Sequence, residues 1–292
     1  MAVVDLTKAR ARASACIEKL SLPLSSRTWR GQAGEFAGAG VGSSIDFQDH
    51  RSYVPGDDPR HINWQAFART GTYTMKLYRE EVRPVVDVLL DVSPSMFFEE
   101  EKAQRVAEVF YTVALSALQS GASLVVHLVS GDAVKKLSNE LIAGEQWWEI
   151  AQEMAKKSNS DVPAVNLVQL RSNAIRVWIS DCLFAGDPSP IVRRLSSQQG
   201  SLIVLSPFSQ SEADPDWSGN YEFVDVELSS KHPHCIDQQA LANYKQTYIN
   251  HFKVWQESAR RYQASFARVD DQADLLKALL TEAVATGGLQ LK

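Results

Sequence analysis

Apolar residues follow two periods along the chain, and each period predicts a different element. Residues 85–90, 124–129 and 175–180 are short, almost entirely apolar runs, which is typical of strands covered on both faces. Residues 98–120 instead place apolar side chains at every third or fourth position and stop at Gly121, as an amphipathic helix does. The same criteria predict strands at 72–79, 134–137, 202–205, 221–227 and 265–269, and helices at 5–20, 145–157, 162–170, 189–197, 237–262 and 271–284.

The alternation of strands and helices predicts an α/β fold with a doubly wound, mostly parallel sheet, because parallel neighbours need a helical crossover. This pattern covers residues 84–287. Residues 1–83 do not show it, since the first helix is followed by glycine-rich sequence and a single clear strand. We therefore expect two domains: an N-terminal helix and β-rich segment over 1–83, packed on an α/β domain over 84–287.

Charge and composition exclude several classes of function and location for this protein. The 292 residues carry a net charge of −5, which argues against nucleic acid as the main partner, since phosphate binding needs a basic surface. No apolar run reaches the ~18–20 residues needed to cross a bilayer, and the N-terminus lacks a signal-peptide pattern. The widely spaced cysteines form no disulfide framework, and "HPHC" at 232–235 is expected to be a loop without metal. We expect a cytoplasmic protein.

Two of the buried strands end in a carboxylate. Asp91 follows the apolar run 85–90, and Asp181 follows 175–180. In doubly wound sheets, ligands bind beyond the carboxyl ends of the strands, where the strand order reverses. Ser93 and Ser95 lie on the turn after Asp91, so their hydroxyls can face the same place. Carboxylate and hydroxyl oxygens are hard ligands, and this set suits Mg²⁺, Mn²⁺ or Ca²⁺.

Other interpretations of this segment remain open. Asp91 or Ser95 could simply cap the following helix, because Asp and Ser are common capping residues. A metal-dependent phosphoryl-transfer or hydrolytic enzyme could use the same crevice, although an aspartyl-phosphate enzyme needs an acid where Ser93 stands. A serine hydrolase is disfavoured because the chain has neither a G-x-S-x-G elbow nor a clearly placed histidine.

The segment "DVSPSM" after an apolar strand resembles the metal-ion-dependent adhesion site of von Willebrand factor A-like domains. The resemblance implies that Asp91, Ser93 and Ser95 form the first loop of the site and that Asp181 is its later carboxylate. It places Ser160 where the family has a threonine, which keeps the hydroxyl. It also implies a bound divalent cation, most simply Mg²⁺, whose coordination an acidic side chain of a protein partner completes.

The sequence upstream of the sheet, residues 42–81, resembles the signature of the DUF58 family. That signature is R-x-Y-x-x-G-D-D-x-R-x-I-D-W followed by A-R-T/S-G. The matching residues are Arg51, Tyr53, Gly56, Asp57, Asp58, Arg60, Ile62, Trp64, Ala68, Arg69 and Gly71. Asn63 stands where the family usually has Asp, and the resemblance extends to "LLKALL" near the C-terminus.

This second resemblance implies a von Willebrand A-like fold and no established catalytic activity. It also implies a role as an adaptor beside MoxR-type AAA+ ATPases or their clients. Within the signature we expect Asp57 and Asp58 to cap, Arg60 to pair with a carboxylate and Trp64 to lie in the core. The sequence thus predicts a non-enzymatic, intracellular protein-interaction module with a metal site.

Overall fold

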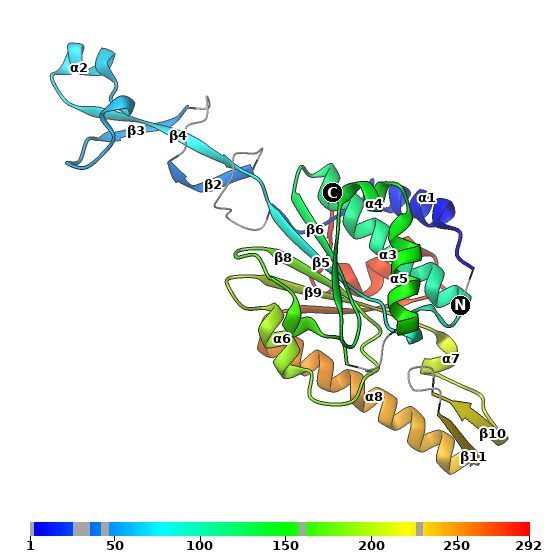
Figure 1. Ribbon diagram of the computed structural model, residues 1–292. Coiled ribbons are helices and arrows are strands. Elements are labelled where there is room, and N and C mark those ends of the chain that lie inside the picture. The colour runs from blue at the N-terminus through cyan, green and yellow to red at the C-terminus, as the bar shows by residue number, and fades with distance from the viewer. Residues whose placement is uncertain (1–2, 26–35, 42–46, 158–161, 226–229) are drawn as a thin grey trace. The chain divides into compact units, whose positions relative to one another are not determined.

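The computed structural model describes residues 3–25, 36–41, 47–157, 162–225 and 230–292. Its main feature is a six-stranded sheet with the strand order β12-β9-β8-β5-β6-β7 (Figure 1). All neighbours are parallel except the edge strand β7, which runs antiparallel to β6. The predicted α/β class with a mostly parallel sheet is confirmed. The strands are β5 (Val85–Asp91), β6 (Ser123–Val129), β7 (Val134–Leu137), β8 (Ile175–Ile179), β9 (Ser201–Phe208) and β12 (Ser265–Asp270).

The strand order reverses at the centre of this sheet. From β5 the chain moves outward to β6 and β7, and then returns to form β8 on the other side of β5. It continues outward from there through β9 to β12. The carboxyl ends of β5 and β8 are therefore the place where a doubly wound sheet binds its ligands.

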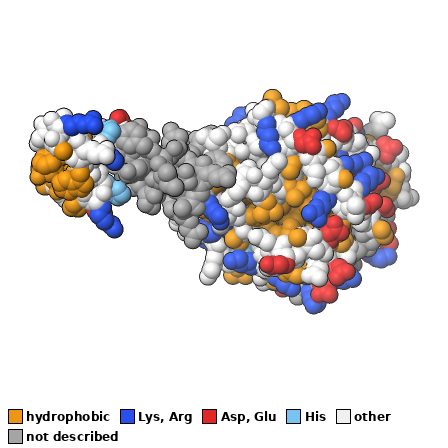
Figure 2. Space-filling model, turned by 90° about the horizontal axis from the view of Figure 1, so that it is seen from above, with side chains coloured by type: hydrophobic (Ala, Val, Ile, Leu, Met, Phe, Trp, Pro, Cys, Tyr) orange, Lys and Arg blue, Asp and Glu red, His pale blue; other side chains and the backbone are white. Residues whose placement is uncertain are grey.

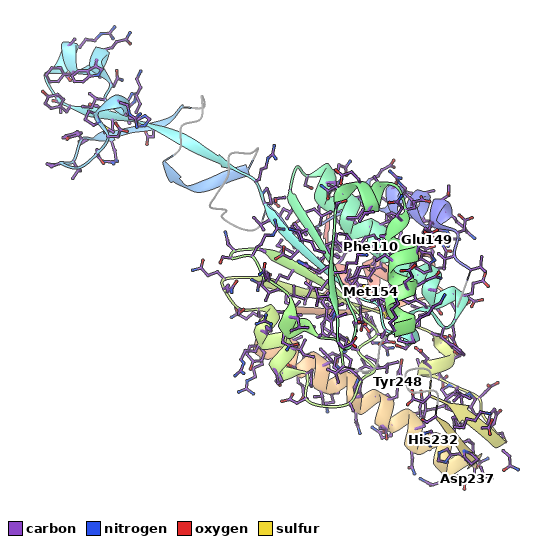
Figure 3. All side chains as sticks on the ribbon, in the orientation of Figure 1. Phe110, Glu149, Met154, His232, Asp237 and Tyr248 are labelled. Carbon is purple, nitrogen blue, oxygen red and sulfur yellow. The ribbon has the colours of Figure 1, made fainter. Side chains whose placement is uncertain are left out.

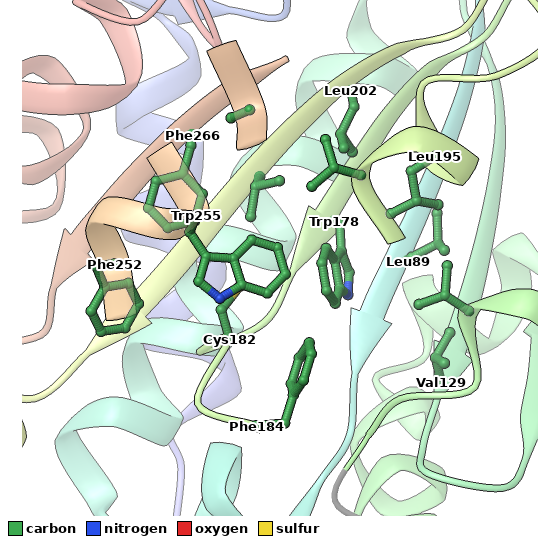
Figure 4. Close-up of a cluster of buried hydrophobic side chains, with 14 of the residues drawn as sticks. Leu89, Val129, Trp178, Cys182, Phe184, Leu195, Leu202, Phe252, Trp255 and Phe266 are labelled. Carbon is green, nitrogen blue, oxygen red and sulfur yellow. The ribbon is translucent and has the colours of Figure 1, made fainter. Parts of the chain in front are cut away.

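Helices cover both faces of the sheet, which explains why its central strands are apolar throughout. α3 packs against one face, and α6 and α8 pack against the other (Figure 1). On the α6/α8 side, Trp178 of β8 meets Trp255 of α8 with ring centroids 5.5 Å apart, inside a buried cluster that includes Phe184 (Figure 4). These helices and their neighbours are α3 (Glu100–Gln119), α4 (Asn139–Ala143), α5 (Gln146–Lys157), α6 (Ser189–Leu195), α7 (Gln210–Ala213), α8 (Gln238–Arg261) and α9 (Leu275–Ala278).

The first helix belongs to the α/β unit rather than to a separate N-terminal domain. α1 (Leu6–Ile17) packs along α3 through its small buried side chains, and β1 (Leu20–Ser21) pairs with β13 (Gln290–Leu291). The chain accordingly divides into residues 1–23 with 85–292, and residues 24–84. This differs from the division at 83/84 expected from sequence, because a helix that closes against a distant helix gives no local sign of its domain.

Residues 24–84 form a unit of their own. A three-stranded antiparallel sheet has the order β2-β4-β3, and the strands are β2 (Phe36–Val41), β3 (Phe47–Ser52) and β4 (Thr74–Val82). Between β3 and β4 lie a 3₁₀ turn at Pro59–His61 and helix α2 (Trp64–Thr70). Asp58 caps the turn ahead of Pro59, and Gly71 ends α2 in the left-handed conformation, as their sequence positions predict.

Three expectations near the C-terminus differ from the structure. The strand expected at 221–227 is β10 (Gly219–Val224), but it pairs with β11 (Lys231–Ile236) as a hairpin outside the main sheet. The "HPHC" segment therefore lies on a strand, not a loop; Figure 3 labels His232 on this strand and Asp237, which caps the start of α8. The helix expected at 271–284 is shorter, since α9 passes into a π-helical turn at Leu279–Val284.

Candidate metal site

The two strand-end carboxylates lie at the reversal of the strand order. Asp91 is the last residue of β5, and Asp181 follows the neighbouring strand β8, which pairs with β5 in parallel. Both side chains are buried. The sequence-based expectation that they share one crevice required these strands to flank the switch point, and the strand order meets that condition.

The carboxylate of Asp91 is held by two donors from different strand ends. The Ser93 amide donates to Oδ1 at 2.9 Å, and the Ser180 hydroxyl donates to Oδ2 at 2.6 Å. Burial, followed by the negative charge of Asp181, raises the pKa of Asp91 to about 7 despite these hydrogen bonds. The two carboxylates therefore interact unfavourably when both are ionised, and a cation beside them would relieve that repulsion.

The two predicted hydroxyls lie on the turn that follows Asp91. Pro94 starts a 3₁₀ turn at Pro94–Phe97, which brings the Ser93 and Ser95 hydroxyls within 3.2 Å of each other. A hydrogen bond from Ser95 reaches Asp181 and helps to lower its pKa. The turn thus joins both carboxylates, so the structure brings Asp91, Ser93, Ser95 and Asp181 together. Ser160 lies outside the described residues.

A buried lysine supports the second carboxylate. Lys102 of α3 donates to Asp181 Oδ2 at 2.9 Å and to Glu212 Oε1 at 2.7 Å, while the Leu183 amide donates to Asp181 Oδ1 at 3.1 Å. Burial alone would raise the pKa of Asp181, but the Lys102 charge and the hydrogen bonds outweigh it and lower the pKa. Burial likewise opposes the charge on Lys102, yet Asp181 and Glu212 raise its pKa above the usual value.

Sequence reasoning missed Lys102, Ser180 and Glu212. The signal for Lys102 was present, because it lies four and eight residues before Val106 and Phe110 on the apolar face of α3. A cation on that face must find a buried partner. Ser180 directly precedes Asp181 and gave no distinguishing signal. Glu212 could not be assigned to the site from sequence, because only the folded chain brings α7 close to Lys102.

The donor set fits a hard divalent cation better than a soft one. Its oxygens come from two carboxylates and two hydroxyls, which Mg²⁺, Mn²⁺ and Ca²⁺ accept as ligands. Over the ranges that the structure describes, no group of three or more His, Cys, Asp or Glu side chains could hold a metal ion. A cation here would consequently rely on the hydroxyls, on water and on an outside ligand.

Comparison with known proteins gives a family and two distant structural likenesses. The family model described as "Protein of unknown function DUF58" matches residues 49–251, more than half of the chain. The match contains all of the signature residues from Arg51 to Gly71 but ends before "LLKALL". No curated protein matches the chain.

Two solved structures from Bacteroides species resemble this chain. An aerotolerance-related membrane protein from Bacteroides fragilis, with multiple mutations to serines, is 16% identical with a TM-score of 0.41, over 68% of this chain and 98% of that one. The conserved hypothetical protein BatB from Bacteroides thetaiotaomicron is 13% identical with a TM-score of 0.40, over 70% and 98%. In the part of this chain that the structure describes, no helix is long and apolar enough to cross a membrane.

Proposed function

The chain belongs to the DUF58 family of proteins of unknown function, and we propose that it is a non-enzymatic adaptor that binds a protein partner through a divalent cation. Asp91, Ser93, Ser95 and Asp181 hold the cation, with Ser160 as a further hydroxyl ligand. The observation that carries the proposal is the meeting of two buried carboxylates and two hydroxyls at the reversal of the strand order. The arrangement resembles the adhesion site of a von Willebrand A-like fold.

The chain itself supplies only a few ligands, so coordination positions on the cation remain open for a partner. Mg²⁺ takes six ligands in near-octahedral geometry and usually keeps several waters. A carboxylate from another protein can replace one of those waters, which makes binding depend on the metal. We propose that this partner is a MoxR-type AAA+ ATPase or one of its clients, an assignment supported by family resemblance.

The metal site is tested by the carboxylate at the end of β5. We expect Asp91→Ala to abolish binding of Mg²⁺ and Mn²⁺ in calorimetric titrations, because it removes one of the two charged ligands. The matched control is Asp132→Ala, which removes an exposed carboxylate from the loop after β6. Equal cation affinity in wild type and Asp91→Ala would remove the proposed site.

The affinity for the cation should fall in acid. The pKa of Asp91 is raised to about 7, so its carboxyl is protonated below that pH and a proton must leave before a cation binds. We expect the dissociation constant for Mg²⁺ to rise about tenfold for each pH unit below about 7, and to level off above it. Calorimetry in buffers of different ionisation enthalpy measures the released proton. A flat profile across this range would contradict the role given to Asp91.

The partner is tested separately from the metal. A tagged form of the chain should retain a purified MoxR-type ATPase in Mg²⁺ and release it in chelator, and Asp91→Ala should retain none. If the ATPase binds equally with and without chelator, the fold acts as a scaffold and the cation is not the contact. If it does not bind while Mg²⁺ titrates normally, the metal site stands and the partner is wrong.

A metal-dependent phosphoryl-transfer or hydrolytic enzyme is the second candidate, and the near-neutral pKa of Asp91 is what favours it. A carboxyl that titrates near pH 7 can exchange protons with a substrate. Both Asp91 oxygens, however, already accept hydrogen bonds from Ser93 and Ser180. Turnover of simple phosphate esters that disappears in Asp91→Asn would establish this alternative.

A further inference from the structure

Two ion pairs stabilise the turn in the signature segment. The guanidinium of Arg51 donates hydrogen bonds to both carboxylate oxygens of Asp57, at 2.7 and 2.6 Å. Asp57 also accepts a hydrogen bond from the Val54 amide at 2.9 Å. Asp58 accepts from the backbone and side chain of Arg60. These pairs lower the pKa of Asp57 through the Arg51 hydrogen bond, and that of Asp58 to about 2 through Arg60. The segment is therefore an ordered turn rather than a loose loop.

Several other signature positions also have local structural roles. Gly56 has a φ of +106° and Gly71 a φ of +67°, conformations that disfavour a side chain. Asn63 caps α2 by accepting from the Ala66 amide at 3.1 Å, so it performs the capping that Asp would perform there. Ile62 is buried and bridges to Met75 of β4.

Trp64 is the exception, because it does not lie in the core as its sequence suggested. Its side chain is 57% exposed, and that of Tyr73 is 47% exposed. Phe67 stacks on Tyr73 with ring centroids 4.3 Å apart, and Trp64 meets both rings edge-on. We call Trp64, Phe67 and Tyr73 the aromatic face. Hydrophobic side chains gather on this unit in Figure 2, and such exposed patches mark interaction sites.

In the two ion pairs of the signature segment, the arginine side chain is more exposed than its aspartate partner. Arg60 is 86% exposed whereas its partner Asp58 is 37% exposed, and Arg51 is 40% exposed against 19% for Asp57. Arg69, on the last turn of α2, is also exposed, but it lies five residues after Trp64 and therefore on another side of the helix. An approaching molecule therefore meets guanidinium groups before carboxylates. Rigid Trp and Tyr rings bordered by Arg are the residues that dominate binding energy in protein interfaces.

We propose that the aromatic face is a docking site for a segment of another protein in which carboxylates flank a bulky apolar side chain. Trp64 and Tyr73 cover the apolar side chain, which removes their own exposed area from water. Arg51 and Arg60 pair with the flanking carboxylates. Charge complementarity selects an acidic partner over a basic one. The site is independent of the proposed cation at Asp91, since it lies wholly within residues 51–73.

A displayed library of random peptides, selected on the full chain, tests the docking site directly. The enriched peptides should combine Asp or Glu with Phe, Trp or Leu. A synthetic peptide of the enriched sequence should bind at least about tenfold more weakly to Trp64→Ser by fluorescence anisotropy, since Trp is enriched among the few interface residues that dominate binding energy. Arg60→Glu should weaken this peptide and favour a version with Lys in place of its acids. Leu167→Ser, which removes an equally exposed apolar side chain elsewhere, should bind as wild type does.

Three results would overturn the proposal. The first is enrichment of peptides without acidic residues, and the second is equal binding to wild type and Trp64→Ser. The third is self-association in analytical ultracentrifugation that Trp64→Ser abolishes, which would assign the face to a second copy of this chain. Circular dichroism is the control that checks whether each variant is folded. Peptide binding should persist in chelator and in Asp91→Ala, so this test and the metal test can fail separately.

Discussion

Lys102→Met is expected to lower the free energy of unfolding by about 3–5 kcal/mol when no divalent cation is present. The substitution keeps most of the side-chain volume but removes a fully buried ammonium from between Asp181 and Glu212. Asp181 is then left as a buried charge close to Asp91, without its main counter-ion. Urea unfolding followed by circular dichroism measures the loss. An unchanged free energy of unfolding would show that this ion pair does not stabilise the fold.

The same variant should bind Mg²⁺ more tightly, by at least about tenfold, because a positive charge next to the site has been removed. Saturating Mg²⁺ should then restore part of the lost stability, about 2.7 kcal/mol at a hundred times the dissociation constant. Glu212→Gln should act in the opposite direction on Mg²⁺ affinity, since it leaves the Lys102 charge less neutralised. Lys245→Met, at a partly exposed pair with Asp214, is the control and should change stability by about 1 kcal/mol or less.

The α/β unit was predictable because each of its main strands and helices has a clear local pattern of apolar residues. The apolar runs that became β5, β6 and β8 are continuous, and the stripe of α3 has a clean helical period. Placing Asp91 and Asp181 near each other rested on the rule that ligands bind where the strand order reverses, and on the condition that β5 and β8 flank that point, which the strand order meets.

What the sequence did not predict depends on contacts between distant segments. Lys102 forms a hydrogen bond with Glu212, which lies 110 positions away in the chain. α1 packs against α3 through small side chains, and nothing in their sequence indicates which helix they contact. Trp64 was misassigned for a different reason. A tryptophan after a capped turn fits a core position by composition, but here its neighbours are two more aromatic rings at the surface. The β10–β11 hairpin was missed because its strands lie outside the main sheet and are largely exposed.

The strand that carries Asp181 depends on its own core, and Trp178→Ala should show how strongly. Trp178 is fully buried between Trp255 and Phe184, three residues before Asp181. Truncating a buried Trp loses its burial and leaves a cavity, so we expect about 3–5 kcal/mol of destabilisation. Urea unfolding followed by far-ultraviolet circular dichroism is the measurement, because a fluorescence signal would change with the tryptophan itself.

The matched variant is Trp64→Ala, which removes the same side chain from an exposed position and should cost about 0.5 kcal/mol or less. The contrast separates the two roles that tryptophan has in this chain. Trp178 holds the strand end from which Asp181 projects, so its loss should also weaken Mg²⁺ binding in the molecules that remain folded. Trp64 belongs to the unit of residues 24–84, whereas Asp91 and Asp181 belong to the α/β unit, so its loss should leave Mg²⁺ binding unchanged while it removes docking at the aromatic face. Equal destabilisation by the two variants would mean that Trp64 packs in the folded chain as Trp178 does, and the docking site would lose its central residue.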